Sequence, residues 1–358
     1  MAAKIKLNFK FWLNIITIGA LVFLVVISWD QIIEAFRKLD SLNTWALLLM
    51  IPIQLISYYG VARLYRDFFA SQGEHVPLKT LYSVALELNF VNHVFPSGGV
   101  SGFSYLSLRL KNLGISTAKS TLAQILRFTL TFISFLVLLF FGMIMLSFGS
   151  NTSPLTILIS STIIFMTIFG VMVGVYIISE LRRINAFVSW LPRALNKLIG
   201  VFRKNRRSVI DIAKVEKTLE DLHQDYILLR KDLGQIKKLL GWALLINITE
   251  VLTIYMVYIA FGSLINPGAL IIAYAVANFA GLIAVLPGGV GIYEGLMTAV
   301  LASAGVEKAL ALSATVIYRV LSMLYFLPVG YYLYQRALKK SDGKIKPSKT
   351  DVTSFITK

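Results

Sequence analysis

The sequence has no cysteine and little charge, and both shortages exclude whole classes of protein. Without cysteine there can be no disulfide, no thiol nucleophile and no cysteine-based metal site. Charged residues make up 15% of the 358 residues, whereas soluble domains carry about 25%. Hydrophobic residues make up 57%, and the mean hydropathy is +0.73. One soluble core cannot bury that much apolar surface, so the composition indicates an integral membrane protein.

Acidic residues are especially scarce, with 18 Asp and Glu against 35 Lys and Arg, and the net charge is +17. Three segments, 1–10, 181–238 and 336–358, hold almost all of this excess. The excess flanks apolar stretches instead of forming a patch within a polar domain. It is therefore a signal of membrane orientation, and we expect no nucleic-acid partner.

Motifs for metals, nucleotides and covalent catalysis are also missing. The three histidines, His75, His93 and His223, have no ligand partners at a metal-binding spacing. No Walker loop, zinc motif or Ser-His-Asp set is recognisable. We therefore expect no metal, no cofactor and no ATP site.

Six apolar segments are long enough to cross a bilayer, which takes about 20 residues. They are Phe11–Trp29, Thr44–Ala62, Thr121–Phe148, Pro154–Ser179, Leu239–Phe261 and Ala309–Leu333. We interpret the first as an uncleaved helix, because its apolar run is too long for a signal peptide and no cleavage site follows it. The predicted fold class is all-α integral membrane, with about six full transmembrane helices.

Two further apolar segments, Leu78–Phe95 and Gly268–Leu286, run into turns rich in proline and glycine, and each is followed by a limb too short to span. The turn residues are Pro96, Gly98 and Gly99, and Pro287, Gly288, Gly289 and Gly291. Such residues break a helix and permit a reversal. We predict re-entrant helical hairpins at 78–112 and 268–304. Irregular backbone survives at membrane depth only inside protein or beside a watery cavity.

The two hairpins share landmarks at nearly constant spacing. An Asn-Phe pair precedes each turn, and three landmark pairs are 191 or 192 residues apart. They are Pro96 and Pro287, Gly114 and Gly305, and Arg127 and Arg319. Apolar helices also resemble one another by chance. The common spacing favours a true internal repeat.

Charge placement predicts the topology. Lys- and Arg-rich loops stay in the cytoplasm. With two re-entrant hairpins every basic segment lies there, whereas a first hairpin that crossed the membrane would put 181–238 outside. The hairpins then enter from opposite sides as inverted repeats, an architecture typical of transporters. The predicted parts are an amino-terminal membrane half (1–180), a cytoplasmic helical insertion (181–238), a carboxy-terminal membrane half (239–335) and a basic cytoplasmic tail (336–358). We expect a multi-pass protein of the cell (inner or plasma) membrane with both termini in the cytoplasm.

Five ionisable residues lie inside apolar segments, where each costs about 2.5–3.5 kcal/mol at the bilayer centre. They are Glu87, Arg127, Glu250, Glu294 and Arg319. They either form structural ion pairs that lock helices together or face a polar pathway. Arg127 and Arg319 occupy equivalent repeat positions, and two guanidinium groups suit one phosphate. The helix start after each glycine pair also suits a phosphate. Asn92 and His93 either line the same cavity or hold the loop backbone.

The insertion at 181–238 shows two helical patterns. From Ile184 to Phe202, one apolar face is surrounded by Lys and Arg, which is typical of an interfacial helix on anionic lipid at the cytoplasmic face. From Ile212 to Ile236, apolar residues recur at spacings of three and four over about three heptads. This seam either packs against the neighbouring helix or forms a coiled coil in a homodimer.

The segments Asn89–Gly102 and Leu286–Gly295 resemble the lysylphosphatidylglycerol synthase transmembrane family, and the Pro-Gly-Gly-x-Gly-x-x-Glu pattern of the second is the more specific match. The resemblance extends over nearly the whole chain. The family includes the flippase half of multiple-peptide-resistance factor, which is believed to move aminoacylated phosphatidylglycerol to the outer leaflet. A separate domain in those relatives attaches the amino acid from aminoacyl-tRNA. Because this chain ends shortly after its last predicted span, we expect that synthase domain to be absent.

The resemblance implies a lipid flippase. The implied translocation residues are Glu87, Arg127, Glu294 and Arg319, with Glu250 beside them. The expected substrate is a phosphate-bearing lipid: phosphatidylglycerol, an aminoacylated form or a polyprenyl-phosphate glycolipid. Without an ATP site, transport would be passive, ion-coupled or driven by membrane potential. Two alternatives are a membrane-embedded lipid-modifying transferase (phosphatidylglycerol lysyltransferase-like) with Glu87 or Glu294 as base, and a scaffold for a lipid or glycan synthase.

Overall fold

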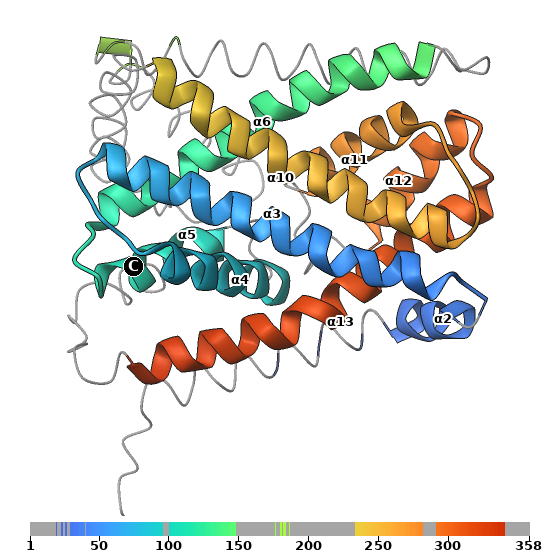
Figure 1. Ribbon diagram of the computed structural model, residues 1–358, viewed down its shortest axis with the longest axis horizontal. Coiled ribbons are helices and arrows are strands. Elements are labelled where there is room, and N and C mark those ends of the chain that lie inside the picture. Colours follow the sequence, from blue (N-terminus) through green and yellow to red (C-terminus); the bar gives the residue numbers. More distant parts are fainter. Residues whose placement is uncertain are drawn as a thin grey trace, which may run out of the picture.

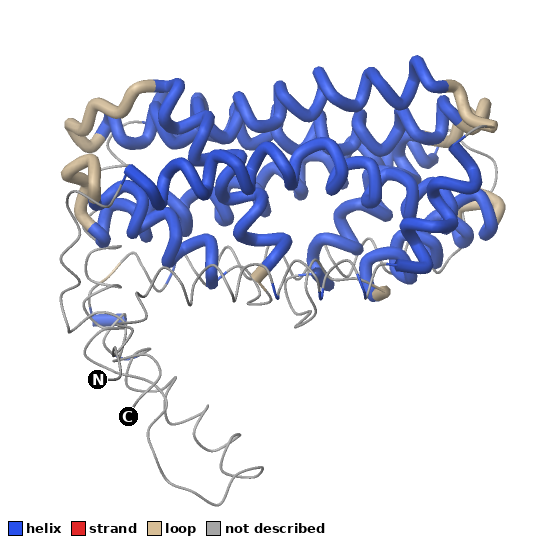
Figure 2. The backbone as a smooth tube through the Cα atoms, turned by 90° about the horizontal axis from the view of Figure 1, so that it is seen from below, coloured by secondary structure: helices blue, strands red, loops and turns tan. Residues whose placement is uncertain are grey.

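The computed structural model describes residues 29–39, 41–95, 100–147, 233–281 and 291–340, with a few single positions before residue 29 and between 176 and 186. These ranges contain helices and turns and no strand, as predicted (Figures 1 and 2). The helices are α2 (Trp29–Leu39), α3 (Thr44–Ser71), α4 (Leu78–Val94), α5 (Val100–Lys111), α6 (Thr117–Ser147), α10 (Leu233–Ala260), α11 (Pro267–Gly281), α12 (Ile292–Ser303) and α13 (Lys308–Lys340).

Helices α3, α6, α10 and α13 are long and apolar enough to cross a membrane. They contain most or all of four predicted spans: Thr44–Ala62, Thr121–Phe148, Leu239–Phe261 and Ala309–Leu333. The other two, Phe11–Trp29 and Pro154–Ser179, lie almost entirely outside the described residues, as do most of the insertion at 181–238 and of the tail at 336–358. The described part therefore supplies four candidate spans.

Two helical hairpins lie within the bundle. Helix α4 packs against α5, and α11 packs against α12. The α4–α5 hairpin starts and finishes at the end of the bundle where α3 stops, whereas the α11–α12 hairpin starts and finishes at the opposite end, where α10 stops (Figure 1). Pro96, Gly98 and Gly99 of the first turn, and Pro287, Gly288 and Gly289 of the second, fall outside the described residues.

Several pairings of α3–α6 have a counterpart in α10–α13, whereas the contact of α6 with α10 has no comparable counterpart between α13 and α3. Helix α3 lies along α10, α5 packs on α6, and α12 packs on α13. The first helix of each hairpin also crosses to the other half, because α4 packs on α13 and α11 packs on α6. Exchanging α3–α6 with α10–α13 leaves these pairings unchanged.

Four glycines give the same backbone turn at corresponding helix ends. Gly73 and Gly262 follow α3 and α10 with φ of +76° and +71°, and Gly114 and Gly305 follow α5 and α12 with φ of +85° and +88°. In each case the amide after the glycine donates to the carbonyl five residues earlier, which caps the helix. The first pair is 189 residues apart and the second 191, so the halves differ by two residues between these turns.

Two glycines let the hairpins pack closely against the spans of the other half. A Cβ atom on Gly268 of α11 would lie 2.2 Å from the carbonyl oxygen of Gly142 on α6. A Cβ atom on Gly330 of α13 would lie 2.7 Å from the carbonyl oxygen of Leu86 on α4. Small residues at such contacts are typical of packed membrane helices. The hairpins are thus held by backbone-to-backbone contact.

Helix α2 was not predicted from the sequence. It packs against α13 and carries Asp30 in its first turn and Arg37 and Lys38 in its last. This charge order favours a helix, because acids stabilise its amino-terminal end and bases its carboxy-terminal end. Its 11 residues are fewer than the roughly 20 that a bilayer-crossing helix needs.

Candidate functional site

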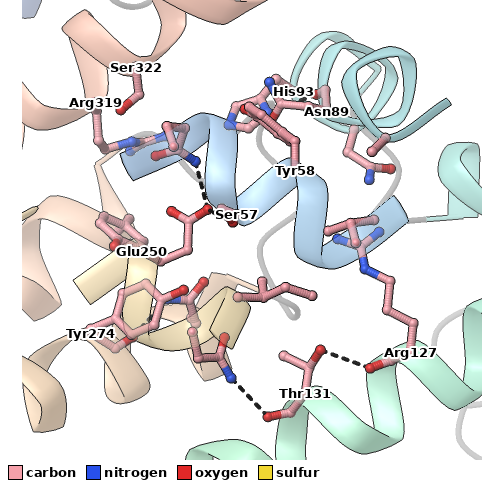
Figure 3. A pocket seen from close by; sticks show the side chains of 18 of the residues that line it. Ser57, Tyr58, Asn89, His93, Arg127, Thr131, Glu250, Tyr274, Arg319 and Ser322 are labelled. Carbon is pink, nitrogen blue, oxygen red and sulfur yellow. Dashed lines mark hydrogen bonds between the residues drawn. The ribbon is translucent and has the colours of Figure 1, made fainter. Parts of the chain in front are cut away.

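A cavity of about 400 Å³ lies among α3, α4, α6, α10, α11, α12 and α13. Pockets of about this volume hold small molecules. Five of the predicted site residues line it: Asn92, His93, Arg127, Glu250 and Arg319. In Figure 3, Arg127 and Arg319 lie at opposite edges of the view. Glu87 and Glu294 are not among the lining residues.

Arg127 is a cation that faces the cavity from α6. It is partly buried. One of its guanidinium nitrogens donates to the hydroxyl of Tyr65 at 3.2 Å, and the guanidinium carbon lies 5.9 Å from the centre of the Tyr65 ring. Within the described part of the chain, no carboxylate lies within ion-pair distance of Arg127. Its charge is therefore available to an anion in the cavity.

Arg319 forms a buried ion pair. Its guanidinium donates to Oε1 of Glu294, and the side chains are 7% and 4% exposed. The other carboxylate oxygen of Glu294 accepts the backbone amide of Gly291 at 2.7 Å. Glu294 thus neutralises Arg319 and also occupies the amino-terminal end of α12, where a phosphate was predicted to fit. The charge of Arg319 is therefore already neutralised, unlike that of Arg127.

Among the described residues, Glu250 supplies the carboxylate that faces the cavity. It accepts hydrogen bonds from Nε2 of Gln54 at 2.6 Å, from the hydroxyl of Ser57 at 3.0 Å and from that of Tyr318 at 3.2 Å. None of these donors is charged. No cationic side chain among the described residues is within ion-pair distance of it.

Glu87 lies in a structural network inside the first hairpin. Its carboxylate accepts the Tyr105 hydroxyl at 2.7 Å and Nε of Arg109 at 3.0 Å, both from α5. Glu87 itself is 1% exposed. A buried pair of this kind fixes helices relative to one another, because leaving either charge alone is costly. The geometry here matches the structural alternative for an intramembrane charge.

Residues 12–330 match the family described as the lysylphosphatidylglycerol synthase TM region. The chain belongs to this family. A UPF0104 membrane protein of Methanothermobacter thermautotrophicus is 22% identical over 322 residues, which cover 89% of this chain and 91% of the relative. A UPF0104 membrane protein of Pyrococcus horikoshii is 22% identical over 315 residues, 86% and 92% of the two chains. The predicted family is confirmed, and the protein is embedded in a membrane with several passes.

In this family member, sequence reasoning missed much of the neutral polar lining of the cavity. Asn89 and Asn278, which belong to the repeated Asn-Phe pairs, both line it. The repeat was a signal that could have found them. Three lining residues, Gln54, Asn92 and Ser322, each carry a buried oxygen that has no hydrogen-bond partner in the described part of the chain. Buried polar atoms usually have partners, so these side chains leave hydrogen-bonding capacity unused beside the cavity.

His93 and the acidic residues give no sign of a metal centre. Nδ1 of His93 lies 2.9 Å from the carbonyl oxygen of Asn89 on the preceding turn of α4. In the ranges that the structure describes, no three His, Asp or Glu side chains gather as a metal would require. The cavity chemistry is that of one available cation, one carboxylate, and amide and hydroxyl groups.

Proposed function

We propose that this protein is a lipid translocase that passes a phosphate-bearing headgroup through the cavity while the acyl chains stay in the bilayer. The observation that carries the proposal is Arg127, a guanidinium without a carboxylate partner in the described chain, facing a polar cavity inside a membrane protein. An intramembrane cation is costly and marks a substrate pathway. Guanidinium groups bind phosphate oxygens through charge-assisted hydrogen bonds.

We propose that the hairpins are re-entrant and that the two halves, completed by two further spans, are inverted repeats. The matched packing of α3–α6 and α10–α13, the four equivalent glycine turns and the entry of the hairpins from opposite ends support this arrangement. Inverted repeats around a central site allow access from each side in turn. The cavity between the halves suits that mechanism.

The proposed orientation places the end with the α4–α5 hairpin in the cytoplasm of the cell membrane, together with both termini and the anionic lipid that the basic segments favour. Most basic residues of the described helices lie near this end. They are Arg63, Arg66, Lys79, Arg109, Lys111, Lys119, Lys237, Lys238, Arg336, Lys339 and Lys340. The opposite end carries Arg37, Lys38 and Lys308. Basic residues beside membrane spans favour the cytoplasm.

Translocation is favoured over the transferase alternative by the state of the two acidic candidates. Glu87 is paired with Arg109, Glu294 is paired with Arg319, and neither carboxylate lines the cavity. A general base needs access to its substrate. The scaffold and homodimer alternatives rest on the insertion at 181–238, which lies mostly outside the described residues.

The first test is Arg127→Ala in proteoliposomes that contain fluorescently labelled phosphatidylglycerol. Added dithionite bleaches label in the outer leaflet, and further bleaching reports transfer from the inner leaflet. We expect at least a tenfold slower transfer, because one good charge-assisted contact is worth about 1.5–3 kcal/mol. Arg66→Ala, at an exposed site, is the matched control and should behave as wild type. Wild-type transfer by a folded Arg127→Ala protein would contradict the proposal.

A further inference from the structure

The cavity holds two opposite charges that are not paired with each other. Arg127 enters from α6 and Glu250 from α10, and no ion pair joins them in the described chain. Glu250 is held by an amide and two hydroxyl groups, all neutral. A carboxylate with only neutral partners is unusual inside a membrane, because burying a lone negative charge there is strongly disfavoured. Both groups are therefore candidates to change partner during transport.

An anionic headgroup at Arg127 would share the cavity with the Glu250 carboxylate. Two negative charges in a low-dielectric site repel each other strongly. A proton on Glu250 removes that repulsion. We propose that Glu250 takes up one proton when an anionic headgroup occupies the cavity, so that anion and proton bind together. The inference rests on the proposed function and deepens it by naming the coupling ion.

The hydrogen bonds around Glu250 fit either charge state. As a carboxylate it accepts from Gln54, Ser57 and Tyr318. As a carboxylic acid it must donate one hydrogen bond. Oε1 of Gln54 is buried and has no partner among the described residues, and Gln54 is 5% exposed. Rotation of this amide would turn the oxygen toward Glu250 as the acceptor. The proton comes from water and returns to water when the headgroup leaves.

The other charged or titratable groups around this cavity limit which residue can accept the proton. They are Tyr58 from α3, His93 from α4, Arg127 from α6, Tyr274 from α11, Tyr293 from α12, and Tyr318 and Arg319 from α13. Arginines stay protonated, and a tyrosine does not lose its proton near neutral pH. His93 is therefore the alternative proton acceptor in this lining, and the test must separate it from Glu250.

Linkage gives the expected pH dependence. If the bound state carries one more proton than the free state, the affinity for the anion falls as pH rises, by up to tenfold per pH unit. The loss begins where free Glu250 is deprotonated. A variant that cannot take up this proton should bind with a flat pH profile.

The experiment is calorimetric titration of the purified full-length protein with dihexanoyl-phosphatidylglycerol, a soluble anionic lipid. Repeating it in two buffers of different ionisation enthalpy gives the number of protons taken up. We expect the number to rise toward one for wild type as the pH increases from mildly acidic to mildly alkaline, and to stay close to zero for Glu250→Gln, which keeps the size of the side chain. His93→Gln, and Glu74→Gln at the ion pair with Lys119 on the protein surface, should keep the wild-type value.

Each of the other outcomes would contradict either the proton coupling or the assignment of the proton to Glu250. Binding by wild type without proton uptake, from mildly acidic to mildly alkaline pH, would overturn the coupling and leave the translocase standing. Loss of uptake in His93→Gln alone would assign the proton to His93 and overturn the proposal. If wild type prefers zwitterionic dihexanoyl-phosphatidylethanolamine and binds it through Glu250 without a proton, Glu250 is the partner of an ammonium group instead.

Failure of the proposed function itself would give a different result from failure of the proton coupling. If wild type binds neither lipid, the headgroup site itself is wrong, and the coupling falls with it. If Glu250→Gln fails to fold, the wild-type proton number and His93→Gln still decide the question, because they establish whether a proton is taken up and whether His93 carries it.

Discussion

Arg127 on α6 and Arg319 on α13 both line the cavity, but their surroundings differ. Arg319 is neutralised by Glu294 inside the protein, whereas Arg127 contacts only a tyrosine among its described charged or polar neighbours. One arginine therefore serves the fold, and we assign the other to the ligand. Their substitutions should fail in different ways.

Arg319→Ala should destabilise the protein. It leaves the Glu294 carboxylate buried without its cation, and breaking a buried pair in this way costs about 3–5 kcal/mol. Arg127→Ala strands no carboxylate in the described chain and should cost less, about 1.5 kcal/mol, the lower end of the range for a hydrogen bond with a charged partner. Thermal unfolding of the purified proteins in detergent compares them. Equal melting temperatures for the two variants would contradict this division of roles.

At the residue scale, the sequence identifies which charges are buried but not which of them meet. Glu87 was predicted as a site residue because it sits in an apolar segment, and no sequence pattern indicated that Arg109 would be its partner. In the structure, Nε of Arg109 lies 3.0 Å from Oε2 of Glu87 across the first hairpin. Five predicted residues do line one cavity. Pairing depends on helix rotation, which hydropathy does not specify.

At the scale of the elements, the hairpins depend on close contact with spans of the other half. Gly268→Leu should push α11 away from α6, because even a Cβ would lie 2.2 Å from a backbone oxygen. Overpacking typically costs about 1–3 kcal/mol, and backbone atoms cannot move aside as side chains do. We expect a lower melting temperature. The matched control is Gly241→Leu on α10, where a Cβ meets nothing within 4 Å.

If Gly268→Leu and Gly241→Leu both have the melting temperature of wild type, the α11–α6 contact is not needed for stability.

The long helices and both hairpins could be predicted from hydropathy and from proline–glycine turns, because these signals are local. Helix α2 could not, since it is short and amphipathic. The crossing of each hairpin to the other half is a tertiary feature that no local pattern reports.

At the scale of the whole molecule, the absence of cysteine makes topology directly measurable. Lys79→Cys lies beside the start of the first hairpin, and Leu264→Cys lies in the loop before the second. We expect a membrane-impermeant maleimide to label the first from the cytoplasmic side and the second from outside. Charge placement supplies the physical reason. Labelling of both from one side would contradict opposite entry of the hairpins.

If lipid headgroups pass through the cavity, a bulky group attached inside it must slow their transfer. Ser322→Cys changes one atom in the lining and adds the chain's sole thiol, while Leu264→Cys, at a position 83% exposed, provides the matched thiol outside it. Both proteins are reconstituted with labelled phosphatidylglycerol and treated with a bulky methanethiosulfonate reagent, and modification is verified by mass. We expect modification to slow transfer at least tenfold in Ser322→Cys and to leave transfer by Leu264→Cys unchanged. Undiminished transfer by fully modified Ser322→Cys would contradict passage of the headgroups through the cavity.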